Sequence, residues 1–271
     1  MGERIRLDKL LADCGKGTRS EVKNYIKKGF VRVNGEVVKS GDIKVDTDVD
    51  TVTFDGGDIS FEKYVYYMLH KPAGVVSATT DNRDKTVIEL ITEEKPRDLF
   101  PVGRLDKDTE GLLIITNDGK LANSLLSPKK HIDKTYYARV VKYKNELATS
   151  DEAAGINNQM SKDVRNVLIT EEIIRNFGEG LDIGDDRLTA PAGLEVLSQT
   201  YNEAEVKITI TEGRYHQIKR MFEAVGLKVI YLKRLSMGKL VLDEELKPGE
   251  YRKLTDEEID MLRNGGCKDE R

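Results

Sequence analysis

A short charged stretch directly before an apolar run is the part of this sequence that most plainly suggests chemistry. The stretch GRLDKDTEGLLIIT, residues 103–116, places an arginine, a lysine, two aspartates and a glutamate ahead of a run typical of a buried strand. Charge beside a hydrophobic core costs desolvation free energy unless it is paired or used. The carboxylates Asp106 and Asp108 are therefore candidates for a chemical role.

Two other roles for these aspartates can be weighed from the residues alone. A glycosidase pair needs carboxylates that face each other across a substrate at roughly 5 to 9.5 Å, and two aspartates so close on one loop flank it from the same side at most. A turn or capping role suits Asp108, whose side chain can bond backbone amides before the strand. It suits Asp106 less well, because Asp106 lies between Leu105 and Lys107 with Arg104 close by.

The elements that must position these residues are mainly strands with interspersed helices. We expect an α+β domain with a large, mainly antiparallel mixed sheet and flanking helices. The predicted strands are VYYMLH and VVSAT on either side of a KPAG turn, GLLIIT, KTYYARVV, AEVKITITEG and KVIYLKRLSMGKLVL. The predicted helices are DGKLANSLLSP, RYHQIKRMFEAVG ending at Gly226, and TDEEIDMLRN with a capping box of Thr255 and Glu258.

The first sixty residues predict a small separate unit. RLDKLLADCG and TRSEVKNYIKKG have the spacing of helices, and Thr18 and Glu21 form a capping box at the start of the second, which Gly29 can end. FVRVNGEVV predicts a hairpin that turns at Asn34 and Gly35.

A basic stripe on the second of these helices predicts RNA binding. Arg19, Lys23 and Lys27 recur every fourth residue beside the apolar face, an arrangement that suits the backbone of folded RNA. The segment from Arg6 to about Phe54 resembles the small RNA-binding domain first described in ribosomal protein S4, with RLDKLL, the RSE helix start and VRVNGEVV in place. That resemblance implies RNA binding without chemistry.

The rest of the chain resembles the family of ribosomal RNA pseudouridine synthases. GRLDKDTEGLLIITNDG matches the catalytic motif of that family, and MLHKPAG, KTYYARV, EGRYHQIKRMFEAVG and LKPGEYRKLT match it in their order along the chain. GRYHQIKRMF and PGEYRKLT indicate the branch acting on small-subunit RNA. The resemblance implies isomerisation of a uridine in 16S ribosomal RNA, of the uridine 516 type, with no metal or other cofactor.

The resemblance also implies which residues are catalytic. Asp106 matches the catalytic aspartate, acting as nucleophile or as the group that drives elimination to a glycal. Tyr136 matches the active-site tyrosine, an aromatic platform for a uridine flipped out of its stack. Lys219 matches the basic residue paired with the aspartate, and a fixed cation favours and orients the ionised carboxylate.

Further residues are implied to hold RNA. Arg104 resembles the position that grips the backbone around the flipped nucleotide, and Ile218 the apolar contact to the base. Arg220 is the alternative to its neighbour Lys219. We expect His216 to be a hydrogen-bonding helper, because the reaction demands no imidazole base.

The domain boundaries follow from these resemblances. We place the S4-like domain at 1–58, a linker at 59–63 and the catalytic domain at 64–265. The glycine-rich stretch DGGDIS, residues 55–60, is typical of a linker to a second domain. A polar insertion relative to the short form of the family is expected at 142–165, and a tail at 266–271.

Charge is unevenly distributed along the chain, although the net charge is −4. The stretches Arg4–Lys39 and Gly213–Lys239 each carry a net +6, whereas Asn145–Glu195 carries −7. The basic stretches predict contacts to nucleic acid, and we expect the acidic one to stay clear of RNA. The isolated Cys14 and Cys267 and the three histidines show neither a disulfide framework nor metal-ligand spacing.

Other classes of protein are disfavoured. No stretch approaches the roughly 18 apolar residues of a membrane span, and MGERIRLDKL lacks the apolar core of a signal peptide. We expect a cytoplasmic monomer that acts on 16S ribosomal RNA or on an assembling small-subunit particle. The alternatives are a synthase for 23S ribosomal RNA and a non-enzymatic RNA-binding or ribosome-assembly protein. Binding alone requires none of Asp106, Tyr136 and Lys219 at those places, which argues against the last.

Overall fold

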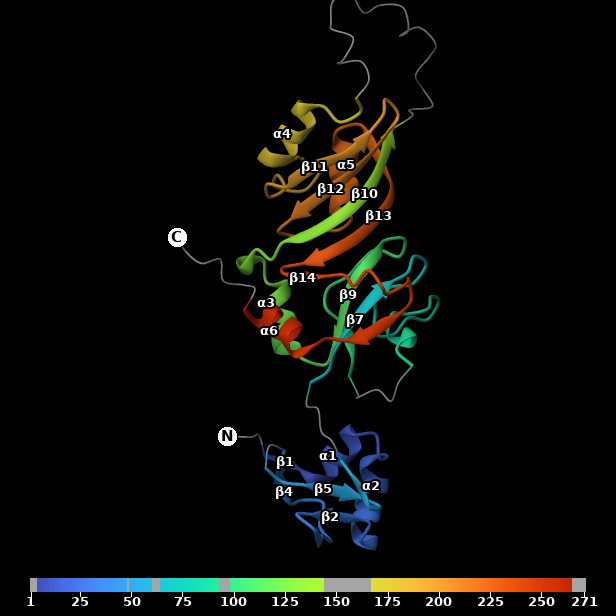
Figure 1. Ribbon diagram of the computed structural model, residues 1–271, viewed down its shortest axis with the longest axis vertical. Helices are drawn as coiled ribbons and strands as arrows, with labels where there is room; N and C mark the ends of the chain where they lie inside the picture. Colours follow the sequence, from blue (N-terminus) through green and yellow to red (C-terminus); the bar gives the residue numbers. More distant parts are fainter. Residues whose placement is uncertain (1–3, 48, 60–63, 93–97, 144–166, 265–271) are drawn as a thin grey trace, which may run out of the picture. The chain divides into compact units, whose positions relative to one another are not determined.

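The computed structural model describes residues 4–47, 49–59, 64–92, 98–143 and 167–264 (Figure 1). The chain divides into two compact units, the first comprising 1–66, 91–100 and 116–118 and the second 67–90, 101–115 and 119–271. Most of the expected linker (60–63), most of the expected insertion (144–165) and the tail (266–271) lie outside the described residues. Among the described helices, none has the length and apolar character needed to cross a bilayer.

The first unit packs two helices against short strands. Its elements are β1 (Arg4–Arg6), α1 (Leu7–Asp13), α2 (Arg19–Lys28), β2 (Val31–Val33), β3 (Glu36–Val37), β4 (Lys44–Asp46), β5 (Val52–Phe54) and β6 (Gly57–Asp58). β1 pairs with β4, and β3, β2, β5 and β6 form a second sheet in that order. Leu7 and Leu11 of α1 pack with Val22 and Ile26 of α2, all without exposed surface, so burial of these apolar side chains holds the helices together.

Local signals set the ends of these elements. The Thr18 hydroxyl accepts from the Glu21 amide, and the Glu21 carboxylate accepts from the Thr18 amide at 2.7 Å, which confirms the capping box. Gly29 ends α2 in the left-handed region at φ 88°. Asn34 and Gly35 turn the hairpin with φ 51° and 83°, the conformation that a tight primed turn requires. The DGGDIS stretch is not wholly linker, because Gly57 and Asp58 pair with β5 as strand β6.

The second unit is built on a large mixed sheet. Its strands are β7 (Tyr66–Lys71), β8 (Phe100–Pro101), β9 (Glu110–Thr116), β10 (Lys134–Lys142), β11 (Gly193–Gln199), β12 (Glu203–Ile210), β13 (Leu227–Met237), β14 (Leu240–Val241) and β15 (Tyr251–Lys253). The strand order is β11-β12-β10-β13-β9-β7-β15, with β14 beside β13 and β8 beside β9. β9 runs parallel to β13, whereas β10 is antiparallel to both β12 and β13. The expected α+β class with a mainly antiparallel sheet is confirmed.

Helices cover this sheet at both ends. They are α3 (Gly119–Leu126), α4 (Glu171–Glu179), α5 (Gln217–Ala224) and α6 (Asp256–Asn264), with 3₁₀ turns at Ile88–Leu90 and Pro128–Lys130. α4 packs against β11 and α5 against β13, and α3 contacts α6 (Figure 1). The Phe177 ring of α4 lies 4.9 Å from the Phe222 ring of α5, so the two helices share one aromatic contact.

Three details differ from the sequence-based expectations. VVSAT forms no strand: Val76 makes only an isolated bridge to Thr86, since its backbone groups bond to the loop at 85–87. The helix expected from Arg214 begins only at Gln217, because His216 takes a left-handed conformation at φ 48°. Helix α4 and strand β11 were not anticipated, although the Thr170 hydroxyl caps α4 by accepting from the amide of Ile173.

Candidate active site

A pocket in the second unit collects residues that are far apart in the sequence. The loop before β9 contributes Asp106, β10 contributes Tyr136 and α5 contributes Lys219. The sheet register explains the meeting, because Arg234 of β13 pairs with Gly111 of β9 on one side and with Tyr136 on the other. Tyr136 therefore lies two strand spacings, about 10 Å, from the start of β9.

Gly111 is required where β9 joins β13. It has φ 105°, and a Cβ atom there would lie 2.2 Å from the carbonyl oxygen of Arg234. Any larger residue would push the strands apart. The glycine in the motif is thus explained by the parallel pairing that fixes the end of the Asp106 loop.

Lys219 lies between the two aspartates of the charged loop. Its Nζ atom is 3.1 Å from Asp106 Oδ2 and 2.6 Å from Asp108 Oδ1. The Asp106 side chain is 27% exposed and that of Asp108 is 72% exposed, so Asp106 is the carboxylate that faces the pocket. The expected pairing of Lys219 with Asp106 is present in the structure, and the additional bond to Asp108 was not anticipated.

Attraction between Lys219 and the two carboxylates shifts the pKa values of Lys219 and Asp108. Burial acts to raise the pKa of Asp108, but the hydrogen bond and the charge of Lys219 outweigh it and hold that pKa below its ordinary value. Partial burial likewise acts to lower the pKa of Lys219, and the bonds from Asp108 and Asp106 raise it overall. The lysine is therefore a permanent cation beside both carboxylates at neutral pH.

Apolar and aromatic side chains form a wall of the same pocket. Tyr136 is 7% exposed and Ile218 is 5% exposed, and both line the cavity. A planar base that entered here would meet a tyrosine ring and an isoleucine side chain close to a carboxylate. That combination suits a heteroaromatic ring better than a polar, non-planar ligand.

Two further residues named from the sequence lie at this pocket. His216 lines it, with Nε2 at 3.6 Å from Asp106 Oδ1. Arg104 also lines the pocket and is exposed, and no ion pair ties its guanidinium to another described residue. Arg104 is therefore available to an anionic ligand.

Ser77 holds the backbone of the loop that carries Asp106. The buried Ser77 hydroxyl donates to the carbonyl oxygen of Leu105 at 2.8 Å and accepts from the amide of Leu105 at 3.0 Å. A single side chain thus satisfies both backbone groups of the residue that precedes Asp106. Sequence reasoning missed this contact, although Ser77 lies shortly after the MLHKPAG motif, separated from it by Val75 and Val76.

Lys71 holds the other side of the loop. Its fully buried ammonium donates to the carbonyl oxygens of Lys107 at 3.2 Å and Thr109 at 2.8 Å, and to that of Pro72 at 3.0 Å. Burial lowers the pKa of Lys71 to about 8, although the charges of Asp108 and Asp106 oppose this. Together, Ser77 and Lys71 fix the backbone on both sides of Asp106.

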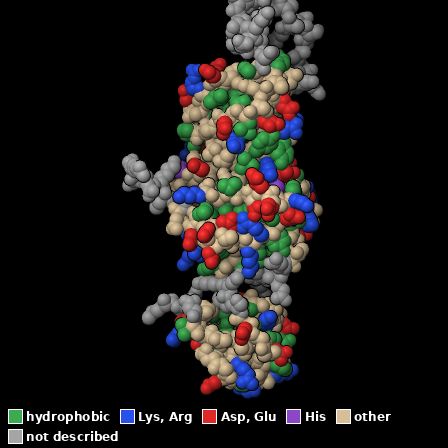
Figure 2. Space-filling view, in the orientation of Figure 1, with side chains coloured by type: hydrophobic (Ala, Val, Ile, Leu, Met, Phe, Trp, Pro, Cys, Tyr) green, Lys and Arg blue, Asp and Glu red, His purple; other side chains and the backbone are tan. Residues whose placement is uncertain are grey.

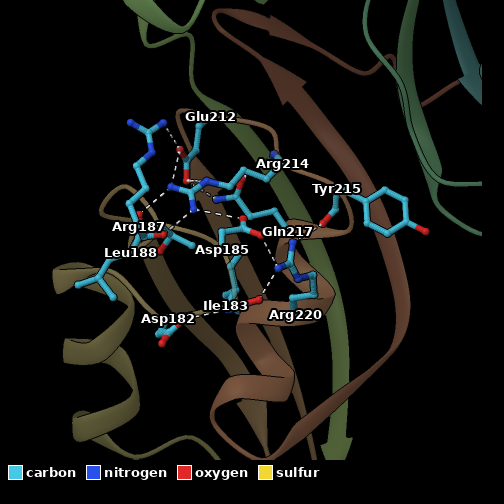
Figure 3. A network of polar contacts seen from close by, with 12 residues as sticks. Asp182, Ile183, Asp185, Arg187, Leu188, Glu212, Arg214, Tyr215, Gln217 and Arg220 are labelled. Atoms are coloured by element: carbon cyan, nitrogen blue, oxygen red, sulfur yellow. Dashed lines mark hydrogen bonds and ion pairs between the residues drawn. The ribbon is translucent and has the colours of Figure 1, made fainter.

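A separate network occupies the other side of α5 (Figure 3). Arg220 bonds Asp185 at 2.6 Å, the carbonyl oxygen of Ile183, and that of Tyr215 at 3.2 Å. Arg214 reaches the same Asp185 at 3.3 Å. The structure therefore places Arg220 outside the pocket lining, where it ties the turn before α5 to the loop at 182–188.

The remaining residues singled out from the sequence lie in the first unit. Arg19, Lys23 and Lys27 are all exposed along α2, as their spacing predicted. Lys23 approaches the buried carboxylate of Asp8 at 3.6 Å, and Asp8 also binds Arg6 at 2.8 Å. The stripe is thus a solvent-facing row of cations.

The chemistry open to the pocket is that of a carboxylate beside a fixed cation. Within the described residues, no cluster of three or more His, Cys, Asp or Glu side chains is placed to hold a metal ion. An ionised carboxylate beside an aromatic wall can attack an electrophilic carbon, stabilise a cationic transition state or drive an elimination.

Comparisons with known proteins agree on one family. The family model described as RNA pseudouridylate synthase matches residues 65–224, and that of the S4 domain matches residues 5–49. An uncharacterized RNA pseudouridine synthase of Bacillus subtilis is 44% identical over 95% of this chain and 98% of its own length.

Two relatives carry more specific names. The ribosomal small subunit pseudouridine synthase A of Vibrio cholerae is 40% identical over 94% of this chain and 98% of its own. The ribosomal large subunit pseudouridine synthase B of Bacillus subtilis is 37% identical, covering 95% of each. A crystal structure of a pseudouridylate synthase is 35% identical, with a TM-score of 0.60, covering 95% of this chain and 99% of that one. The chain belongs to the RNA pseudouridylate synthase family and carries an S4 domain ahead of the catalytic part.

Proposed function

We propose that this chain converts a uridine of 16S ribosomal RNA, of the uridine 516 type, into pseudouridine. The observation that carries the proposal is the carboxylate of Asp106, 3.1 Å from the ammonium of Lys219 in a pocket walled by Tyr136 and Ile218. Choice of the small subunit is supported by the relatives named small subunit synthase A at 40% identity. The large-subunit relative at 37% identity keeps 23S ribosomal RNA as the alternative substrate.

The reaction itself rearranges atoms without redox change. The bond from uracil N1 to ribose C1′ breaks, a bond from C5 to C1′ forms, C5 loses a proton to solvent and N1 gains one. Asp106 acts either as nucleophile or as the base of an elimination to a glycal. Lys219, 3.1 Å from the Asp106 carboxylate, orients it beside the phosphates of the substrate.

The base must leave its stack to reach Asp106, and the pocket wall receives it. Tyr136 and Ile218 contact the flipped uracil, while Arg104 binds the phosphate backbone at the mouth. His216 donates or accepts a hydrogen bond near Asp106. This assignment leaves Arg220 without an RNA contact, because its guanidinium is already bonded to Asp185 and to backbone carbonyls.

The first unit supplies affinity in this proposal. We take residues 1–58 as the S4-like domain, 59–63 as a linker and 64–265 as the catalytic domain. The exposed row of Arg19, Lys23 and Lys27 neutralises RNA phosphates and releases counterions. The protein acts as a monomer on naked RNA or on an assembling small subunit, and the cofactor-free chemistry needs no further component.

Release of tritium tests the function directly. Wild-type protein is incubated with 16S RNA, with 23S RNA and with assembling small subunits, each labelled with tritium at C5 of uridine. We expect one equivalent of tritium per 16S RNA or per particle, and reverse-transcription mapping of the modified site. Release of tritium from 23S RNA alone would assign the chain to the branch that acts on the large subunit. Binding of 16S RNA without any release would make it a non-enzymatic ribosomal RNA-binding protein.

A further inference from the structure

Tyr215 presents an unusually exposed aromatic ring beside the pocket. The residue is 76% exposed, and among the large hydrophobic residues described only Val49 is more exposed. Its ring stacks on the ring of His216, with centroids 3.9 Å apart and an angle of 17° between the planes. An exposed ring with one face covered leaves its other face open to a planar ligand.

The backbone under this ring pair is held rigidly. His216 takes a left-handed conformation at φ 48°, which a non-glycine residue adopts when its surroundings impose it. The carbonyl oxygen of Tyr215 accepts from Arg220, and Arg220 and Arg214 both bind Asp185. Figure 3 shows the ring of Tyr215 directed away from this network. The ring is therefore presented on a fixed support.

The stacked pair extends from the pocket that contains Asp106 to the exposed surface beside it. His216 lines the pocket with Nε2 at 3.6 Å from Asp106, whereas Tyr215 is outside the lining. The exposed Arg104 lies on the same pocket and can hold a phosphate nearby. A nucleic-acid strand whose base occupies the pocket would thus pass close to the open face of Tyr215.

We propose that the Tyr215–His216 ring pair binds, by stacking, the base of a nucleotide that flanks the flipped uridine. Flipping removes one stacking partner from each neighbouring base, and an aromatic side chain can replace it. The inference rests on the proposed function, since it takes a uridine in the pocket as given. It adds a second base site to the one formed by Tyr136 and Ile218.

Fluorescence gives a direct probe of stacking, because the chain has no tryptophan. Tyr215→Trp adds a single reporter with no background, and Tyr201→Trp is the matched control at another tyrosine of the second unit that is 52% exposed. We expect a 16S RNA fragment that contains the modified uridine to quench the reporter at 215 and not the one at 201. Unchanged emission at 215 on a saturating fragment would overturn the inference.

Abasic substitutions locate the stacked nucleotide. Each of the nucleotides flanking the target uridine is made abasic in turn, and the Kd is measured for wild type, Tyr215→Phe and Tyr215→Ala. One abasic position should weaken wild-type binding by roughly 5- to 100-fold. Tyr215→Phe should retain this sensitivity, and Tyr215→Ala should lose it, because a stacking contact is already absent. Equal sensitivity of wild type and Tyr215→Ala at every position would refute the contact.

Rate measurements separate this inference from the proposed function. At saturating RNA, Tyr215→Ala should react at close to the wild-type single-turnover rate, since the ring does not touch Asp106. If wild type releases tritium and the abasic series shows no dependence on Tyr215, the stacking site fails and the function stands. If wild type releases no tritium from ribosomal RNA, the function itself fails.

Discussion

The helices α2 and α5 both carry cationic side chains, but the surroundings of those cations differ. On α2, the row of Arg19, Lys23 and Lys27 is exposed, and within the described residues only Lys23 of the three approaches a carboxylate, that of Asp8 at 3.6 Å. On α5, Lys219 and Arg220 each lie 2.6 Å from a carboxylate oxygen. The stretches containing these helices carry the same net charge of +6, so net charge does not distinguish an available cation from one already bound.

The difference separates affinity from rate. An exposed cation exchanges its counterion for a phosphate and so contributes binding that depends on salt. In the proposed function, the cation of Lys219 positions the reacting carboxylate of Asp106 and so contributes to the rate of the bound complex. On the face shown in Figure 2, basic and acidic side chains are interspersed rather than segregated. Neighbouring groups, rather than regional charge, therefore decide what each cation does.

Among these variants, Asp106→Asn should have the largest effect, and the quantity affected should be the rate of isomerisation. The amide keeps the shape of the side chain but is no nucleophile, so we expect single-turnover isomerisation to fall by at least about 1,000-fold with RNA binding nearly unchanged. Asp108→Asn makes the same chemical change at the exposed partner of Lys219 and should cost less than about 10-fold. Tritium release and filter binding measure the two quantities. Equal losses in both variants would mean that the reacting carboxylate is misassigned.

Lys219→Met should lower the rate by about 100-fold even at saturating RNA, because about 2.7 kcal/mol of transition-state stabilisation would be lost. Lys219→Arg keeps the charge with a different geometry and should retain partial activity. Arg220→Met removes the neighbouring cation and should mainly lower the melting temperature, since it frees the loop at 182–188. A Lys219→Met protein that reacts at the wild-type rate on saturating RNA would place Lys219 among the binding residues.

The affinity side of the comparison is tested by a triple substitution of Arg19, Lys23 and Lys27 with glutamine. We expect the slope of log K against log salt to fall by roughly 2 to 3, at about 0.7–0.9 for each phosphate contact. The single-turnover rate at saturating RNA should be unchanged. Binding titrations from about 50 to about 200 mM salt provide the slopes. Superimposable slopes for wild type and variant would exclude phosphate contacts by this stripe.

Ser77→Ala should lower the rate by about 10-fold, because a buried amide without a partner costs about 1–3 kcal/mol and the loop gains freedom. The effect should fall on the rate at saturating RNA rather than on RNA affinity. Ser198→Ala, at an exposed serine of β11, is the matched control and should be neutral. If Ser77→Ala lowers stability but leaves the rate intact, Ser77 supports the fold without positioning Asp106.

Lys71 tests a cation that is neither exposed nor paired with a carboxylate. Its pKa is lowered to about 8 in the folded protein from an ordinary 10.5, so between these values the unfolded state binds more protons. The free energy of unfolding of wild type should therefore rise with pH relative to Lys71→Met, by at most about 1.4 kcal/mol per pH unit. Below pH 8 the difference should be constant. Urea unfolding of both proteins across this range measures it, and a difference that stays flat up to pH 10.5 would contradict the lowered pKa.

Local features were readable from the sequence by itself. The Thr18–Glu21 capping box, the Asn34–Gly35 turn and the buried strand after Glu110 each depend on residues a few positions apart, so short patterns determine them. The motif around Asp106 indicated the family, and with it Tyr136 and Lys219 as partners. The α+β class followed from the succession of strand and helix patterns.

Only the tertiary structure decided which groups meet. Lys219 and Asp108 are 111 positions apart and their 2.6 Å contact depends on β13 lying between β9 and β10. Ser77 bonds to Leu105, and Lys71 bonds to Lys107 and Thr109. These partners are far apart in the sequence, and no helical or strand periodicity relates them. Similarly, the left-handed turn at His216 shortened a helix that its sequence favours, because neighbouring arginines and Asp185 hold the turn. Short-range patterns determine helices, turns and strands, whereas contacts across the sheet depend on how the whole unit folds.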